Sequence, residues 1–293
     1  ELIYVMSKLI YYIIIKPLSL IPLWMLYFIS DGIFFILYYL TPYRKKIVFT
    51  NLHNAFPEKS KQEIEKISKK FYRHFTDLIA ESIRMFSMPE HEVLRRFKIE
   101  DTDLFNDLYK KGKSIIITGG HYNNWEMLAL AINQQIPHQV AALYTPMRNI
   151  FFNTTFLNSR SRFGVIMVHK KKVKNFFNAQ LLNLTATLFG SDQSPSMHSK
   201  SYYRTRFLNQ ETAVLFGTEK YAIEYNYPVV FMHIQKIKRG HYLATSQLIE
   251  LNPQKTAYGE ITGKHTALLE KEIINKPEYW LWSHKRWKIK FEK

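Results

Sequence analysis

Apolar residues dominate the start of the chain, where the first 43 residues differ from everything that follows. Residues 17–43 read PLSLIPLWMLYFISDGIFFILYYLTPY and carry a single charge, on Asp31. The run is long enough to cross a bilayer, which takes about 20 apolar residues, although Pro17 and Pro22 interrupt it. We therefore expect a membrane anchor over residues 1–43, either spanning the bilayer or lying in its interface. A buried core helix is the competing interpretation.

Basic residues lie on both sides of this apolar run. Three of them, at positions 44–46, follow it directly, whereas Lys8 and Lys16 precede it. Cytoplasmic flanks of membrane segments are enriched in Lys and Arg, and the denser basic flank here continues into the rest of the chain. The larger domain, residues 44–293, is therefore expected on the cytoplasmic side of the membrane.

Beyond residue 44 the pattern changes to alternating helices and strands. Ser60 and Glu63 have the spacing of a capping box, and the helix that follows has apolar residues three and four apart at Ile64, Ile67, Phe71, Phe75, Leu78 and Ile79. We expect short apolar strands at 114–118, 140–145, 165–169, 184–189, 229–234 and 242–249, and further helices at 103–110, 125–131, 171–181, 211–224 and 263–276. Such alternation is typical of a buried, parallel sheet. The expected fold is thus an α/β domain in which helices flank a mostly parallel central sheet.

The net charge of the chain indicates which classes of molecule it is suited to bind. The chain has 41 Lys and Arg against 24 Asp and Glu, a net charge of +17, which favours an anionic membrane, an acidic protein or nucleic acid. The sequence contains no cysteine, which excludes disulfides, thiolate metal sites and a cysteine nucleophile. A basic protein that binds nucleic acid is the rival class, but the apolar run at 17–43 and the lack of the usual RNA-binding motifs oppose it.

The sharpest local motif is TGGHYNNWE, residues 118–126, which lies where a strand is expected to end and a helix to begin. Ligands bind at such carboxyl ends of parallel strands. On one regular helix His121 and Glu126 would point about 140° apart, so they converge only if His121 lies in the turn and Glu126 in the first helical turn. A histidine held by a carboxylate has a fixed tautomer and acts as a general base. The alternative is a capping histidine beside a glutamate that pairs with a surface lysine.

Four further segments accompany this motif. They are N-L and A-F-P-E within 51–58, Y-T-P-M-R-N at 144–149, S-D-Q at 191–193 and PEYWLWSHKRWK at 277–288. H-x4-E after a strand resembles the H-x4-D/E motif of the glycerolipid acyltransferase superfamily, and the whole set resembles its bacterial branch, the lipid A biosynthesis late acyltransferases. The resemblance runs from about residue 44 onward. It departs at Phe207-Leu208-Asn209, which stands where the family has F-F-G, so substrate inference is affected more than the reaction type.

The resemblance implies a membrane-associated O-acyltransferase of the bacterial inner membrane. A fatty acyl chain would pass from acyl-carrier-protein thioester, or from acyl-CoA as the other donor, to a hydroxyl group of a lipid A precursor or a related anionic glycolipid. His121 would be the general base and Glu126 the residue that orients it. We expect no metal and no further cofactor. An aminolipid, glycolipid or lysophospholipid acceptor is the alternative within the same reaction class. The chain has no G-x-S-x-G elbow, which agrees with direct attack by a substrate hydroxyl.

The resemblance also implies a set of substrate-binding residues. Arg160 and Arg162 are expected to bind a lipid or glycan phosphate through forked hydrogen bonds, with an ordinary solvated pair as the alternative. Asp192 either holds an arginine or the acceptor, or forms an Asx turn. Asn149 either caps a helix or positions the acceptor. The remaining candidates are Arg148, Gln193 and Asn124, the last of which is also a candidate N-cap.

The C-terminal tract mixes tryptophans with basic residues. We expect Trp280 and Trp282 to pack in the core. The run from His284 to Lys288, which includes Arg286, is expected to be a solvated face.

Overall fold

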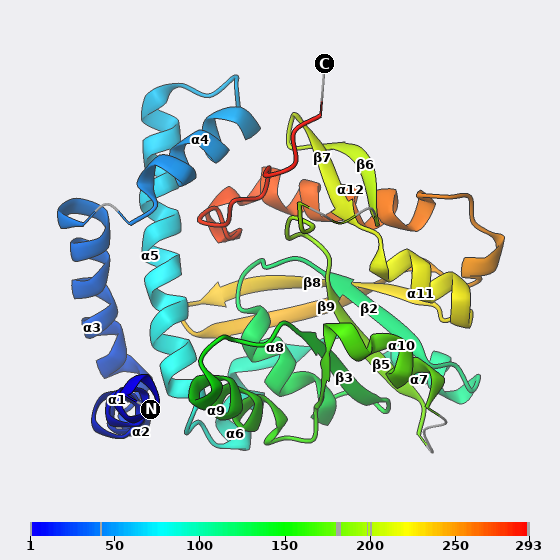
Figure 1. Ribbon diagram of the computed structural model, residues 1–293, viewed down its shortest axis with the longest axis horizontal. Helices are drawn as coiled ribbons and strands as arrows, with labels where there is room; N and C mark the ends of the chain where they lie inside the picture. The colour runs from blue at the N-terminus through cyan, green and yellow to red at the C-terminus, as the bar shows by residue number, and fades with distance from the viewer. Residues whose placement is uncertain (1, 42, 180–182, 198, 200, 292–293) are drawn as a thin grey trace.

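The computed structural model describes residues 2–41, 43–179, 183–197, 199 and 201–291 (Figure 1). At its centre lies a seven-stranded sheet in the order β1-β9-β8-β2-β5-β3-β4. The strands are β1 (Phe97–Ile99), β2 (Ile115–Gly119), β3 (Gln139–Tyr144), β4 (Ile166–His169), β5 (Thr185–Gly190), β8 (Val229–Lys238) and β9 (His241–Glu250). Neighbouring strands are parallel except for β8 and β9, which form an antiparallel hairpin. The expected α/β fold with a mostly parallel sheet is confirmed.

Helices cover both faces of the sheet, which explains why its strands are apolar on both sides. On one side lie α6 (Glu90–Arg96), α7 (Asp103–Lys110), α8 (Trp125–Ala131) and α9 (Ile150–Ser161). On the other side lie α10 (Val173–Asn178), α11 (Gly217–Tyr225) and α12 (Glu260–Asn275). Strand β2 shows the two faces clearly, because Ile115 and Ile117 pack with the first group and Ile116 packs with the second. Short 3-10 turns join these elements at η3 (Ile132–Gln134), η4 (Lys170–Lys172), η5 (Pro253–Lys255) and η6 (Pro277–Tyr279).

The apolar N-terminus forms two helical rods beside the α/β body. The first consists of α1 (Leu2–Leu9), the π-helical turn η1 (Ile10–Ile15) and α2 (Lys16–Leu20), and the second of α3 (Leu23–Phe35) and the π-helical turn η2 (Ile36–Leu40). They are separated at Pro22, whose backbone is extended. By length and composition both could cross a membrane, and only 11% and 28% of their apolar windows are buried. The single run expected from residue 17 is therefore two rods, and their exposure opposes the core-helix interpretation.

Two helices connect these rods to the sheet. They are α4 (Lys45–Ala55) and α5 (Lys61–Met85), and α5 runs between α3 and the sheet (Figure 1). The expected capping box is confirmed, because the Ser60 side chain accepts from the Glu63 N–H and the Glu63 carboxylate accepts from the Ser60 N–H. The division at residue 43 between an anchor and a catalytic domain stays a prediction.

The expected helix at 211–224 is wrong in its first half. Residues 210–215 instead form β7 (Gln210–Leu215), which pairs with β6 (Tyr202–Phe207) in a separate two-stranded ribbon. The connecting residues Leu208 and Asn209 both have positive φ, as a two-residue hairpin turn requires. A short apolar run such as Ala213 to Leu215 suits a strand as well as a helix. Residues 180 and 181 of the expected helix at 171–181 lie outside the described residues.

Candidate active site

The loop between β2 and α8 lies at the carboxyl edge of the sheet, as the motif predicts. Gly119 ends β2 and pairs in register with Gly190, the last residue of the neighbouring parallel strand β5. The loops that follow the two strands therefore leave the sheet side by side. One loop carries His121 and the other carries Asp192. We call residues 119–124 the His121 turn.

Asp192 holds the imidazole of His121. Asp192 Oδ1 lies 2.6 Å from Nδ1 of the ring. Asp192 Oδ2 accepts two hydrogen bonds of 2.8 Å, one from the His121 backbone N–H and one from Trp280 Nε1. A carboxylate at Nδ1 places the proton on that nitrogen and leaves Nε2 as the basic atom. With this tautomer the Gln193 amide, 3.1 Å from Nε2, donates to it.

The surroundings of this pair favour its charged form. Burial alone would lower the pKa of His121, but the charge and hydrogen bond of Asp192, together with the charge of Glu126, raise it above the ordinary value. Burial alone would raise the pKa of Asp192, but His121 and the hydrogen bonds to the carboxylate hold it well below its usual range. Asp192 is therefore a carboxylate at neutral pH, and His121 is a stronger base than a free imidazole.

Close packing restricts the imidazole ring. A Cβ added at Gly190 would lie 3.1 Å from Cε1 of His121, so a larger residue at this strand end would push the ring by a few tenths of an ångström. Trp125 also packs against the ring in a T-shaped arrangement, with centroids 5.0 Å apart. A ring fixed in this way needs little reorganisation before it accepts a proton.

Glu126 does not orient His121 as expected. Its carboxylate instead accepts a bidentate pair from Arg160, at 2.8 Å from Nε and 2.5 Å from Nη2. Among the described residues no hydrogen bond joins Glu126 to the ring, because Asp192 already occupies Nδ1. Glu126 acts on His121 only through its charge. The fork of Arg160 is thus committed to Glu126, where the sequence suggested a phosphate.

Of the other predicted site residues, three make structural contacts and one is exposed. Asn124 accepts from the Met127 N–H and caps α8, and Asn149 accepts from the Phe152 N–H and caps α9. Arg162 donates to backbone carbonyls of Ser159 and Met85 and does not line the pocket described below. Arg148 is exposed. Of the predicted set, the structure brings together His121, Asp192, Gln193, Glu126 and Arg160.

The C-terminal tract contributes to the site in a way that the sequence did not reveal. Trp280 and Trp282 are buried, as expected, but the hydrogen bond from Trp280 to Asp192 was not foreseen. A tryptophan in a buried segment gives no indication of where its N–H points. The expectation of a solvated face is wrong at Arg286, which is 2% exposed and donates to the Ala213 carbonyl. Desolvation lowers the pKa of Arg286 to about 10, so this guanidinium keeps its charge at neutral pH.

A pocket of about 740 Å³ opens at the His121 turn. His121, Gln193, Glu126 and Arg160 lie in its wall, together with further polar residues such as Lys170 and Thr145. Apolar side chains from both faces of the sheet also line it, among them Leu128, Met167, Val173, Leu188, Phe189 and Met232. A pocket of this size, apolar with a few convergent polar groups, is typical of a binding site for a small or elongated apolar ligand. Among the described residues no cluster of three or more His, Asp or Glu is placed to hold a metal ion.

Comparison with known proteins agrees with the resemblance seen in the motifs. The family model described as bacterial lipid A biosynthesis acyltransferase matches residues 2–289. The chain is 22% identical over 249 residues to the lipid A biosynthesis palmitoleoyltransferase of Escherichia coli (strain K12), covering 84% of this chain and 79% of the relative. It is 24% identical over 250 residues to the lipid A biosynthesis lauroyltransferase of the same organism, covering 85% and 80%. A lipid A biosynthesis acyltransferase of Shigella flexneri is 22% identical over 249 residues, with 84% and 79% covered.

Proposed function

The chain belongs to the bacterial lipid A biosynthesis acyltransferase family, and on that premise we propose that it moves a fatty acyl chain from acyl-carrier-protein thioester to a hydroxyl group of a lipid A precursor. The observation that carries the proposal is the His121–Asp192 pair, whose imidazole lies in the wall of a largely apolar pocket. The pair supplies a base, and the pocket supplies room for an acyl chain. No nucleophilic side chain is needed if the acceptor hydroxyl attacks directly.

In the proposed mechanism His121 Nε2 removes the proton from the acceptor hydroxyl. The oxygen attacks the thioester carbonyl, the tetrahedral intermediate collapses, and the carbon–sulfur bond breaks. The proton held by His121 then passes to the leaving sulfur, so an ester and a free thiol result. Asp192 stabilises the imidazolium that forms between these steps. Gln193 occupies Nε2 in the present structure, so the acceptor hydroxyl must displace its amide.

The Arg160–Glu126 pair is assigned a supporting role. It lies in the polar wall of the pocket, close enough for both charges to affect the pKa of His121 in opposite directions. The bidentate geometry holds Glu126 in one position, and its negative charge favours the protonated ring that forms during the reaction. This assignment replaces the direct Glu126–His121 contact expected from the sequence.

Location and partners follow from the donor and acceptor. The two apolar rods, which contain α1 to α3, are consistent with an enzyme that associates with a membrane. A lipid acceptor would lie in the same membrane. Acyl carrier protein is acidic and cytoplasmic, which fits the net charge of +17 and a catalytic domain on the cytoplasmic side of the inner membrane. Acyl-CoA is the alternative donor. The mechanism needs no metal and no redox cofactor.

The proposal is tested by acyl transfer with the purified protein in detergent. Acyl-carrier-protein thioesters of several chain lengths and the matching acyl-CoA are offered as donors to a Kdo-bearing lipid A precursor, and the product is followed by mass. A gain of one acyl chain supports the proposal, and its mass identifies the chain. If no donor gives a gain from folded protein, the lipid A acceptor is wrong, and aminolipid, glycolipid and lysophospholipid acceptors are tested in the same assay.

The pH dependence of kcat/KM tests the state of the base. Because the base must be neutral to accept a proton, activity should fall as the pH drops through the pKa of His121. That pKa is raised, so the acid limb should lie above the value of about 6.5 that is usual for histidine. In Glu126→Gln the loss of a negative charge should move the limb to lower pH. A profile that is flat between pH 5 and 8, or a limb that moves upward in Glu126→Gln, would contradict the assignment.

A further inference from the structure

Glu81 of α5 connects four parts of the molecule. Its side chain is fully buried. Glu81 Oε1 accepts from the Tyr27 hydroxyl of α3 at 2.8 Å. Glu81 Oε2 accepts from the Tyr242 hydroxyl of β9 at 2.8 Å and from Asn124 Nδ2 at 2.5 Å. Burial raises the pKa of Glu81, whereas Lys236 and the two phenols oppose that effect. Three donors converge on this carboxylate, so its position fixes theirs.

The Asn124 contact leads to the proposed base. Asn124 uses its amide nitrogen for Glu81 and its amide oxygen for the Met127 N–H, so one side chain both caps α8 and ties the end of the His121 turn to α5. Asn123, before it, has a φ of 53° and donates to the Ile234 carbonyl. The first turn of α8 carries Trp125 and Glu126, the residues that pack on His121 and hold Arg160.

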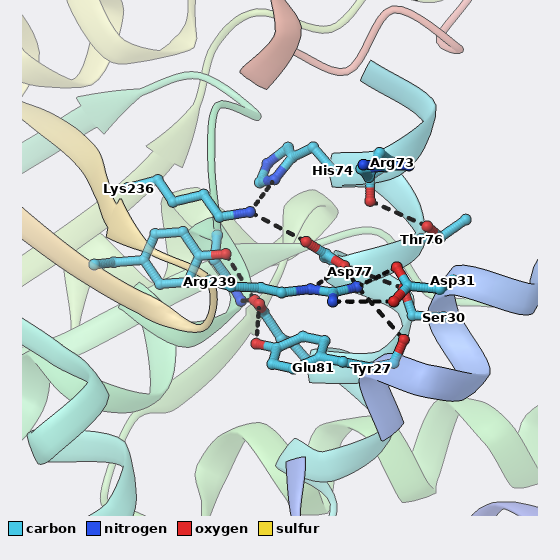
Figure 2. Close-up of polar contacts among 12 residues, drawn as sticks. Tyr27, Ser30, Asp31, Arg73, His74, Thr76, Asp77, Glu81, Lys236 and Arg239 are labelled. Atoms are coloured by element: carbon cyan, nitrogen blue, oxygen red, sulfur yellow. Dashed lines mark hydrogen bonds and ion pairs between the residues drawn. The ribbon is translucent and has the colours of Figure 1, made fainter. Parts of the chain in front are cut away.

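The Tyr27 contact leads to α3, in the second of the two apolar rods. Tyr27, Ser30 and Asp31 lie three and four residues apart on one face of α3, and this face turns toward α5 (Figure 2). Ser30 donates to Asp77, and Arg239 of the loop after β8 bonds both Asp77 and Asp31. The same helix exposes Trp24 and Phe28, at 62% and 71%, and buries Leu23 and Leu26 against Ala80 of α5. Helix α3 is therefore docked on α5 by polar contacts together with apolar packing, and it also offers apolar side chains to its surroundings.

We propose that Glu81 is a positioning residue for the His121 turn and that Tyr27 makes α3 part of the same support. As a statement about catalysis this rests on the proposed function. The path runs from the Tyr27 hydroxyl through the Glu81 carboxylate to the Asn124 amide, and from there to Trp125 and Glu126. Displacements near 1 Å at a catalytic group can lower turnover by about 100-fold, so a support of this kind controls kcat more than acceptor binding.

Two substitutions test the path by kinetics. In Glu81→Gln the new NH2 group must face either the Tyr27 hydroxyl or both donors at Oε2, and the bonds to the remaining oxygen lose their negative charge. We therefore expect kcat to fall between about 10- and 100-fold while KM for the acceptor changes little. Tyr27→Phe removes one hydrogen bond and keeps the ring beneath Arg239, and kcat should fall by about 2- to 10-fold, the equivalent of one net hydrogen bond. In the Glu81→Gln background Tyr27→Phe should have no further effect. Tyr12→Phe, an exposed tyrosine of η1, is the matched control and should match the parent.

A spectroscopic readout makes the test independent of activity. The full chain in detergent is labelled with 5-fluorotryptophan, and Trp125→Phe assigns one of the five fluorine resonances. Glu81→Gln and Tyr27→Phe should both move the Trp125 resonance and leave that of Trp287 in place. A Trp125 resonance that stays fixed in both variants overturns the proposal, and so does an equal shift of Trp287, which indicates general loosening.

If Trp125 moves but the parent transfers no acyl chain, the proposed function fails and the positioning path stands. If the parent is active and Glu81→Gln keeps its kcat, the path fails and the function stands.

Discussion

Replacing His121 with alanine should lower kcat about 10²- to 10⁴-fold, the usual contribution of a general base. In the proposed mechanism the acceptor hydroxyl then has no group to receive its proton, because the remaining polar residues of the pocket wall do not replace Nε2. Binding of the donor and acceptor should change little, since the apolar lining is untouched. The measurement is the initial rate of acyl transfer at saturating donor, with product followed by mass.

The control for this variant is His53→Ala. His53 is exposed on α4, so its removal tests whether losing any histidine disturbs the protein. Turnover of His121→Ala within about threefold of the parent, in folded protein, would remove His121 from the mechanism, because this is far below the contribution of a general base. Partial rescue of His121→Ala by added imidazole would support the assignment.

Replacing Asp192 with asparagine should lower kcat by about 10³- to 10⁴-fold, a loss like that seen when the carboxylate of a catalytic triad becomes an amide. Both groups that point at Oδ2, the His121 backbone N–H and Trp280 Nε1, are donors. The amide oxygen of asparagine must therefore take the place of Oδ2. Its NH2 group then faces Nδ1 of His121 and donates to it. The ring proton moves to Nε2, and the basic atom is lost although the shape of the site is kept.

This prediction separates Asp192 from a merely structural acid. Asp107→Asn, at an exposed position of α7, serves as the control and should behave as the parent. Nitrogen-15 spectra of His121 report the tautomer directly, with the proton on Nδ1 in the parent and on Nε2 in Asp192→Asn. A parent-like tautomer together with parent-like turnover would show that Asp192 does not set the state of the base.

Local patterns predicted the position of His121 but not the carboxylate that contacts it. The Gly-Gly break after an apolar strand is a property of adjacent residues, and it correctly placed His121 at the carboxyl edge of the sheet. Asp192 is 71 residues further along the chain and reaches His121 only through the register between β2 and β5. Sequence spacing favoured Glu126 because it is close along the chain, whereas the pleat and pairing of two strands decided the actual contact.

Burial of polar residues was likewise hard to read from the sequence. The capping box at Ser60 was predicted correctly because both of its hydrogen bonds lie within four residues. Arg286 stands among exposed basic residues, and only the fold of the C-terminal segment against β7 buries it. Glu81 lies on a helix with many charged neighbours, so nothing in its local pattern marks it as the acceptor of donors from α3, α8 and β9.

The hydrogen bond from Trp280 to Asp192 has a consequence for the order in which the protein is made. Helices α1 to α3 are synthesised before the α/β body, and Trp280 follows some 240 residues after the apolar rods end. At about 5–20 residues per second that interval lasts roughly 12–48 s. During this time the nascent chain comes to contain both apolar rods and the His121 turn, but Asp192 lacks one of its donors. A chain cut short before Pro277 should therefore keep the rods and the His121 turn, while the Asp192 carboxylate has only its contacts to His121. The support of the proposed base is thus completed only when the C-terminal segment that carries Trp280 has been made.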